Sequence, residues 1–163
     1  QDGVLAFAEG MGRGGPDGEP ATLDTLFRWG GLTRVLTAAT LLKVIDESKH
    51  PLVAPLPGVL PSATPASLAG LSLHHLLTDT AGLFDDEATL CAAPDLATVA
   101  ARTAAGPRAA PAGAVYLPSR NGYAVAGAVL EAHAGQPFEE VVRRRLLRPA
   151  GMVSATFDPQ RHR

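Results

Sequence analysis

The stretch Thr25-Leu-Phe-Arg-Trp-Gly-Gly-Leu-Thr-Arg-Val-Leu-Thr-Ala-Ala-Thr-Leu-Leu-Lys-Val44 decides the fold. From position 32 to position 48 the apolar residues recur at i, i+3, i+4 and i+7, which is the period of one helix face. The sequence therefore predicts a helix over 32–48 whose buried face holds Leu32, Val35, Leu36, Ala39, Leu42 and Ile45. The following Lys49-His50-Pro51 is expected to end the helix, because proline cannot continue the hydrogen-bond ladder.

Further helices are predicted from capping residues and apolar spacing. Ser72 is an N-cap candidate for a short helix within 71–83, and Asp95 is one for the helix that follows it. Apolar spacing predicts a helix over 121–135, and the proline at position 137 favours the start of a last helix over 137–147.

Two other segments receive non-helical predictions. Residues 3–9 are expected to form a short strand, and the glycine-dense residues 10–18 a turn, which together would make a β-hairpin. The acidic run Asp85-Asp86-Glu87 is expected to be a solvated loop.

Composition excludes several classes of function. The 163 residues suit one globular domain, and a net charge of −2 gives no basic surface for nucleic acid. A single cysteine, Cys91, forms no internal disulfide. No apolar run reaches the ~18 residues that span a bilayer, so no membrane partner is expected, and the compartment stays open. No histidine, cysteine or acidic cluster has metal-ligand spacing, so neither metal nor cofactor is expected.

Four stretches resemble the serine β-lactamase-like family of class C β-lactamases, penicillin-binding proteins of the DD-peptidase type and related esterases. They are the opening stretch, Leu71-Ser-Leu-His-His-Leu-Leu-Thr-Asp-Thr-Ala-Gly-Leu83, Ala112-Gly-Ala-Val-Tyr-Leu-Pro-Ser-Arg-Asn-Gly-Tyr123 and Leu146-Leu-Arg-Pro-Ala-Gly-Met-Val-Ser-Ala-Thr-Phe157. The second is similar to the family motif I-T-I-R-H-L-L-T-H-T-S-G-L, in which His75 takes a structural position. The resemblance implies an α+β fold in one domain over 1–163, mainly the helical lobe with a reduced antiparallel sheet. The family's N-terminal helix and C-terminal strands have no counterpart in this sequence.

The same resemblance implies that the catalytic motifs are degenerate. In the family motif S-x-x-K, Gly31 takes the place of the serine nucleophile and Arg34 that of the lysine base. In the motif P-G-x-x-F-x-Y-S-N, Pro118 takes the place of the tyrosine and Arg120 that of the asparagine. Glycine has no nucleophile, and arginine stays protonated, so we expect conventional Ser/Lys/Tyr hydrolase chemistry to be lost.

Two residues near these positions are poor candidates to replace the missing catalytic groups. Thr33 should face elsewhere, about 200° around the helix from Gly31. Tyr116 occupies a position that normally packs, so a core role is expected for it.

Three hypotheses for function follow from a family resemblance combined with altered catalytic motifs. The first is a hydrolase or acyltransferase that uses non-standard residues, and the second is a catalytically silent pseudoenzyme. The third keeps the pocket to bind an anionic small molecule or to catalyse a non-covalent cyclisation or rearrangement. The expected ligand-binding residues are Trp29, Gly31, Arg34, Tyr116, Ser119 and Arg120. Alternatively, each arginine turns outward or pairs with an acid such as Asp79.

Assembly is the last expectation. A hairpin at residues 4–9 without covering strands would expose an edge, and the predicted helices carry apolar faces that need a partner. We therefore expect a homodimer or a complex with a partner subunit.

Overall fold

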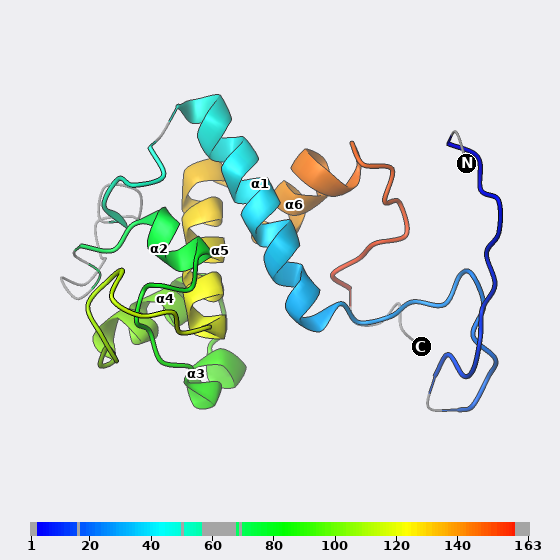
Figure 1. The fold of residues 1–163 in the computed structure, drawn as a ribbon, viewed down its shortest axis with the longest axis horizontal. Coiled ribbons are helices and arrows are strands. Elements are labelled where there is room, and N and C mark those ends of the chain that lie inside the picture. The colour runs from blue at the N-terminus through cyan, green and yellow to red at the C-terminus, as the bar shows by residue number, and fades with distance from the viewer. Residues whose placement is uncertain (1–2, 16, 50, 57–67, 69, 159–163) are drawn as a thin grey trace. The chain divides into compact units, whose positions relative to one another are not determined.

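The computed structural model describes residues 3–15, 17–49, 51–56, 68 and 70–158, and it is helical (Figure 1). Its described residues contain isolated β-bridges but no strand. The predicted α+β class with a reduced antiparallel sheet is therefore wrong for this part of the chain. The chain divides into two compact units, one of Gln1–Gly31 with Ser154–Arg163 and one of Leu32–Val153.

The helices are joined by connections of very different length, the longest between α1 and α2 and between α4 and α5. A 3-10 turn, η1, leads into α1, and a π-helical turn, η4, continues α6. Their bounds are η1 (Gly30–Leu32), α1 (Thr33–Ser48), α2 (Leu73–Leu77), α3 (Glu87–Ala92), α4 (Leu96–Ala105), α5 (Arg120–Ala134), α6 (Phe138–Val142) and η4 (Arg143–Leu147). All predicted helices are present, and α3 is additional to them.

Side-chain caps explain where several helices begin. The Ser72 hydroxyl accepts from the backbone N–H of His75 at the start of α2, and the Asp95 carboxylate accepts from Thr98 N–H at the start of α4. Asp86 caps α3 by accepting from Ala88 N–H. All three residues of the acidic run 85–87 are exposed, as expected for a solvated segment, but the loop ends at Asp86 because its carboxylate satisfies a free N–H group of a helix that begins at Glu87.

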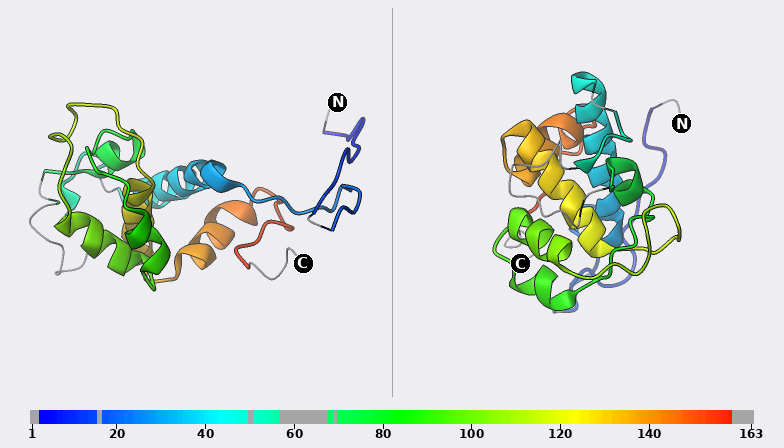
Figure 2. Two further views of the ribbon diagram at one scale, coloured as in Figure 1. Left: turned by 90° about the horizontal axis from the view of Figure 1, so that it is seen from below. Right: turned by 90° about the vertical axis from the view of Figure 1, so that its left-hand side faces the viewer.

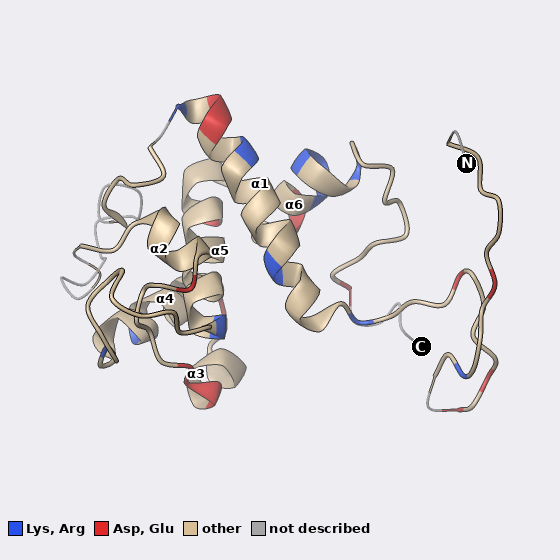
Figure 3. Cartoon of the chain, viewed as in Figure 1, with Lys and Arg blue, Asp and Glu red and all other residues tan. Residues whose placement is uncertain are grey.

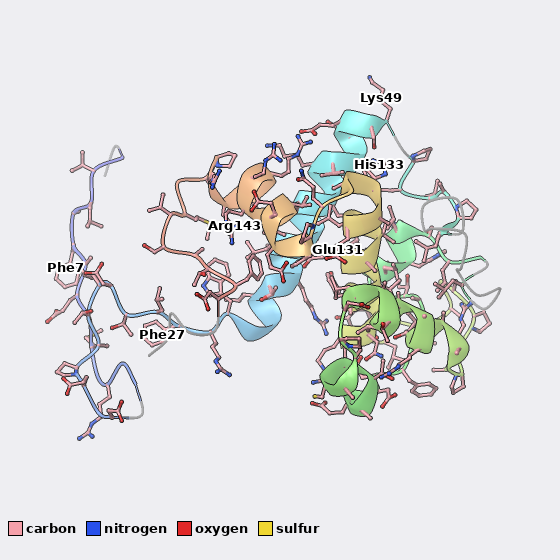
Figure 4. All side chains as sticks on the ribbon, turned by 180° about the vertical axis from the view of Figure 1, so that it is seen from behind. Phe7, Phe27, Lys49, Glu131, His133 and Arg143 are labelled. Atoms are coloured by element: carbon pink, nitrogen blue, oxygen red, sulfur yellow. The ribbon has the colours of Figure 1, made fainter. Side chains whose placement is uncertain are left out.

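The hydrophobic core of the second unit is built around α5. Helices α1, α2, α4 and α6 all pack against α5, which lies among them in each view (Figure 2). The buried apolar side chains come from these helices and include Leu41, Val44, Ile45, Leu73, Leu76, Val99, Ala100, Val125, Ala126, Val129, Leu130, Val141 and Val142. Hydrogen bonds add to this packing: Glu131 of α5 accepts from the first N–H of α6, at Phe138 (Figure 4).

Helix α1 exists where the sequence predicts it, but a different face is buried. Leu32 and Val35 are more than half exposed, whereas Thr37 and Thr40 are buried. The threonine hydroxyls donate to backbone carbonyls one turn earlier, at 3.0 and 2.8 Å, which removes the cost of burying them. Helix α1 carries two stripes of side chains at helical spacing, and tertiary packing buries the one that contains Thr37 and Thr40. Helix α1 ends at Ser48, because Lys49 adopts a left-handed conformation with φ 55°.

The N-terminal segment departs most from expectation. Residues 3–9 form no strand, so the predicted hairpin strand is wrong. Farther along, an isolated bridge joins Arg13 to Pro20, and Gly14 N–H donates to Glu19 O at 2.8 Å. The turn expected within 10–18 is therefore present without regular strands beside it. A short strand gains little stability without a neighbour to complete its ladder, which is the physical reason for the difference.

Some predictions lie outside the described residues. One of them concerns His50, in the Lys49-His50-Pro51 run that is expected to end the first helix. Among the residues that are described, no helix has the length and apolarity to cross a membrane. The same residues contain no group of three or more histidine, cysteine or acidic side chains that could hold a metal ion.

Candidate functional site

Arg34, the residue at the expected base position, forms an ion pair near the start of α1. Its Nη1 lies 3.2 Å from Oδ2 of Asp79, a residue 45 positions later in the chain. The two side chains are 28% and 11% exposed, so the pair is shielded from much of the solvent. The open alternative in which Arg34 pairs with Asp79 is therefore the arrangement that the structure shows.

Asp79 connects three parts of the second unit. Its Oδ1 accepts from the backbone N–H of Ser119 at 3.0 Å, and its own carbonyl accepts from Leu117 N–H at 2.8 Å. The backbone of Asp79 is left-handed, with φ 54°, a conformation that aspartate tolerates better than most residues. One carboxylate thus joins α1, the turn after α2 and the segment that leads into α5.

Arg120 is engaged by a second set of acids at the start of α5. Its Nε lies 3.0 Å from Oδ2 of Asp85, and its Nη2 pairs with the Glu87 carboxylate. Figure 3 shows the acidic residues at the start of α3 beside this end of α5. The hydrogen bond to Glu87, followed by that to Asp85, raises the pKa of Arg120 above its already high value. Arg120 is therefore a permanent cation whose charge is already balanced within the chain.

Ser119 and Asp85 form the polar centre of this cluster. The buried Ser119 hydroxyl donates to Asp85 Oδ1 at 3.0 Å and accepts from Gly122 N–H at 2.9 Å, so it is the N-cap of α5. Burial alone would raise the pKa of Asp85, but hydrogen bonds from Arg120, Asn121 N–H and Ser119 outweigh it and lower that pKa. Both hydrogen-bonding functions of the Ser119 hydroxyl are used inside the protein.

The two tyrosines of this region differ in environment. The hydroxyl of Tyr123 donates to the Leu77 carbonyl at 2.9 Å, and the Arg34 guanidinium lies 5.0 Å from the centre of its ring. Burial raises the pKa of Tyr123, so its hydroxyl stays protonated at neutral pH. Tyr116, by contrast, is 72% exposed, and the expected core role for it is wrong.

His75 belongs to the capping box of α2. Its Nδ1 accepts from Ser72 N–H at 3.2 Å while its own backbone N–H donates to the Ser72 hydroxyl, which gives content to the structural position that the family resemblance implied. Burial, and then the charges of His74 and Arg108, lower the pKa of His75. A neutral imidazole suits this geometry, because protonated Nδ1 would meet an N–H donor.

Known proteins resemble this chain in sequence and in structure. The beta-lactamase family model matches residues 1–163. The chain belongs to the beta-lactamase family. Its architecture is shared with the octameric penicillin-binding protein homologue from Pyrococcus abyssi, at 22% identity and a TM-score of 0.81, over 99% of this chain and 40% of that one. A structure of SurE with D-Leu matches at 33% identity and a TM-score of 0.78, over 93% of this chain and 34% of that one.

Sequence relatives within the family include an esterase and a penicillin-binding protein. Esterase EstB of Burkholderia gladioli is 36% identical over 70 residues, which are 40% of this chain and 18% of that protein. Penicillin-binding protein 4 of Amycolatopsis lactamdurans is 27% identical over 148 residues, which are 88% of this chain and 39% of that protein. The chain therefore spans less than half the length of these beta-lactamase family relatives.

The remaining residues of the expected beta-lactamase-like site fall in both units. Trp29 and Gly31 belong to the first unit, and Arg34, Tyr116, Ser119 and Arg120 belong to the second. A Cβ at Gly31 would meet nothing within 4 Å among the described atoms. Pro118 is exposed immediately before the N-cap of α5. Ion pairing at Arg34 and Arg120 brings in Asp79, Asp85 and Glu87, of which the sequence indicated only Asp79 as a partner.

Proposed function

We propose that this chain is a beta-lactamase family member that does not use the family's serine acylation chemistry. The observation that carries the proposal is the Arg34–Asp79 ion pair. A general base must be able to lose its proton near neutral pH, and a guanidinium paired with a carboxylate cannot. Gly31, one turn before Arg34, supplies no hydroxyl for such a base to activate.

The hydroxyl groups near this position are poor substitutes for a nucleophile. Ser119 is buried and caps α5, and the Thr37 hydroxyl is buried and donates to Thr33 O. Tyr123 donates to a backbone carbonyl, and its raised pKa opposes formation of a phenolate. Each hydroxyl would have to leave an internal hydrogen bond before it could react, which supports the loss of covalent chemistry.

Binding without acylation is the function that we propose in its place. The relatives include proteins named as an esterase and a penicillin-binding protein and a SurE structure that holds D-Leu, so small-molecule recognition is a reasonable inheritance. An anion at Arg34 or Arg120 would have to displace Asp79, or Asp85 and Glu87. The pairing of both arginines therefore favours a ligand whose anionic group, if it has one, is bound elsewhere.

Covalent labelling tests the proposal directly. Benzylpenicillin, a fluorophosphonate and a nitrophenyl ester should each leave the intact mass of the folded protein unchanged, because neither nucleophile nor base is present. An active serine β-lactamase labelled in parallel is the positive control. A stoichiometric adduct on any residue would overturn the proposal and favour an enzyme that uses non-standard residues.

A gain-of-function variant sharpens this test. Gly31→Ser combined with Arg34→Lys should fold, since a Cβ at position 31 meets no described atom within 4 Å. We expect weak acylation at most, because Asp79 would hold the new ammonium in its charged form and Pro118 has no proton to transfer. Rapid stoichiometric acylation of this double variant would show that the rest of the catalytic site is intact.

A further inference from the structure

Arg108 has a buried guanidinium edge with no hydrogen-bond partner. It lies between α4 and α5, where its backbone forms an isolated antiparallel bridge with Leu83 and Ala109 N–H donates to Gly82 O at 2.8 Å. Its Nε and Nη2 are both buried, and neither donates to an acceptor in the described part of the chain. The backbone around this guanidinium is thus fixed, while two of its donor atoms are unsatisfied.

Four other arginines of the second unit, Arg34, Arg120, Arg143 and Arg145, each form an ion pair with a carboxylate. The remaining ones, Arg102, Arg144 and Arg148, are exposed to solvent. Arginine cannot relieve burial by losing its proton, because its pKa is too high. A buried charge that is neither paired nor hydrogen-bonded is strongly unfavourable, so buried charges in proteins are paired or bind a ligand. Arg108 therefore requires an acceptor.

One neighbour of Arg108 is a histidine. His75 of α2 lies near enough for the Arg108 charge to act on it, and burial, His74 and Arg108 all lower the pKa of that imidazole. No carboxylate is among the groups that shift it. Because Nδ1 of His75 accepts from Ser72 N–H, the proton of the neutral ring lies on Nε2. Nε2 is therefore a further donor, and Gly113, whose Cβ would lie 3.7 Å from it, places no side chain against it.

The two unsatisfied atoms define the shape of the missing acceptor. Nε and Nη2 project their hydrogens in parallel from the same edge of a guanidinium, and this edge forms paired hydrogen bonds with the two oxygens of a carboxylate or phosphate. Arg120 uses the same two atoms on Asp85 and Glu87. A single carbonyl or hydroxyl would leave one donor unsatisfied, so the geometry favours an oxyanion.

We propose that Arg108 is the anchor of an oxyanion-binding site, in which its Nε and Nη2 bind the carboxylate or phosphate group of a small molecule beside His75. The site does not involve Arg34 or Arg120, whose carboxylate partners remain in place. It does not depend on whether the chain can be acylated, so the proposal and the proposed function can fail separately.

Thermal unfolding in different anions tests the site. Wild type, Arg108→Gln and Arg144→Gln are compared in sodium phosphate, sodium acetate and sodium chloride at equal ionic strength and pH. Arg144 is the matched control because it is exposed and its guanidinium donates to the Gln136 side chain. Phosphate or acetate should raise the Tm of wild type and Arg144→Gln, relative to chloride, by several degrees more than that of Arg108→Gln. The more effective anion identifies the preferred group.

Two more variants separate binding from a structural role. Arg108→Lys keeps the charge but lacks the paired donors, so it should lose most of the anion-specific rise in Tm. Arg108→Leu should melt at or above the wild-type Tm in chloride, because the unsatisfied buried charge is gone, and below wild type in the effective anion. Equal anion effects in all proteins, which would mean a general salt effect, or an Arg108→Leu that is equally destabilised in every salt, would overturn the proposal.

Discussion

Three arginines differ in how their charge is balanced: Arg34, Arg120 and Arg108. The first two stand where the resembling family motifs have a lysine and an asparagine, and both form ion pairs with acids of the same unit. Asp79, the partner of Arg34, takes the place of a histidine in the family motif L-T-H-T-S-G. The cation at position 34 and the anion at position 79 stabilise each other, so the effect of replacing one residue should depend on whether the other is present.

A double-mutant cycle measures the interaction between Arg34 and Asp79. We expect Arg34→Ala to lower the free energy of unfolding by about 1–3 kcal/mol, toward the lower end because the Arg34 side chain is 28% exposed. Asp79→Asn keeps an acceptor for Ser119 N–H and should cost less. Combined, the two changes should cost less than their sum, by roughly 1 kcal/mol. Urea denaturation gives the values, and simple additivity would mean that the ion pair contributes nothing.

At the level of elements, the helices depend on local caps that the sequence displays. The α2 capping box is unusual in having a histidine, His75, at its third position. Glutamate or glutamine is the usual residue there. Because neutral His75 accepts from Ser72 N–H, the start of α2 is coupled to the protonation of one imidazole.

Stability should therefore depend on pH through His75. Burial, then His74 and Arg108, lower its pKa in the folded protein below the usual histidine value of 6.5. The unfolded chain then binds more protons between the folded pKa and 6.5, so stability rises with pH in this window and is lost as pH falls through it. His75→Gln keeps a capping side chain but does not titrate, so its free energy of unfolding should change less between pH 7.5 and 5.

The control for this experiment is His133→Gln. His133 is an exposed histidine in the last turn of α5 and takes no part in the α2 capping box, so the comparison separates the cap from the loss of any histidine (Figure 4). Urea denaturation at several pH values compares the three proteins. A His75→Gln variant that loses stability with acid as steeply as wild type would show that other groups dominate.

For the molecule as a whole, the exposed apolar side chains are the main feature left unexplained by the internal core. In the first unit Leu5, Phe7, Met11 and Phe27 are all more than 60% exposed, and Figure 4 labels both phenylalanines. In the second unit Leu32 of η1 and Val35 of α1 are exposed to a similar extent. A contiguous patch of such side chains would be typical of an interaction site.

We expect self-association or binding of a partner subunit through this surface. Light scattering at micromolar concentration should give a mass above that of one chain, and Val35→Glu should reduce it, because a charge on the exposed stripe of α1 cannot be buried cheaply. Lys43→Glu, also exposed on α1, controls for added negative charge. A cooperatively melting monomer of wild type would remove the expectation.

The sequence alone determined the helix positions, the caps at Ser72 and Asp95 and the membership of the beta-lactamase family. These depend on spacing and on contacts three or four residues apart, which a linear pattern records. Tertiary structure decided which stripe of α1 is buried, because two stripes were apolar enough and packing against α5 selected one. Tertiary structure also decided which acids pair with Arg34 and Arg120, because those acids lie 33 to 45 positions away in the chain. It likewise left Nε and Nη2 of Arg108 without a hydrogen-bond acceptor among the described residues. Only the folded chain brings distant charges together or keeps them apart.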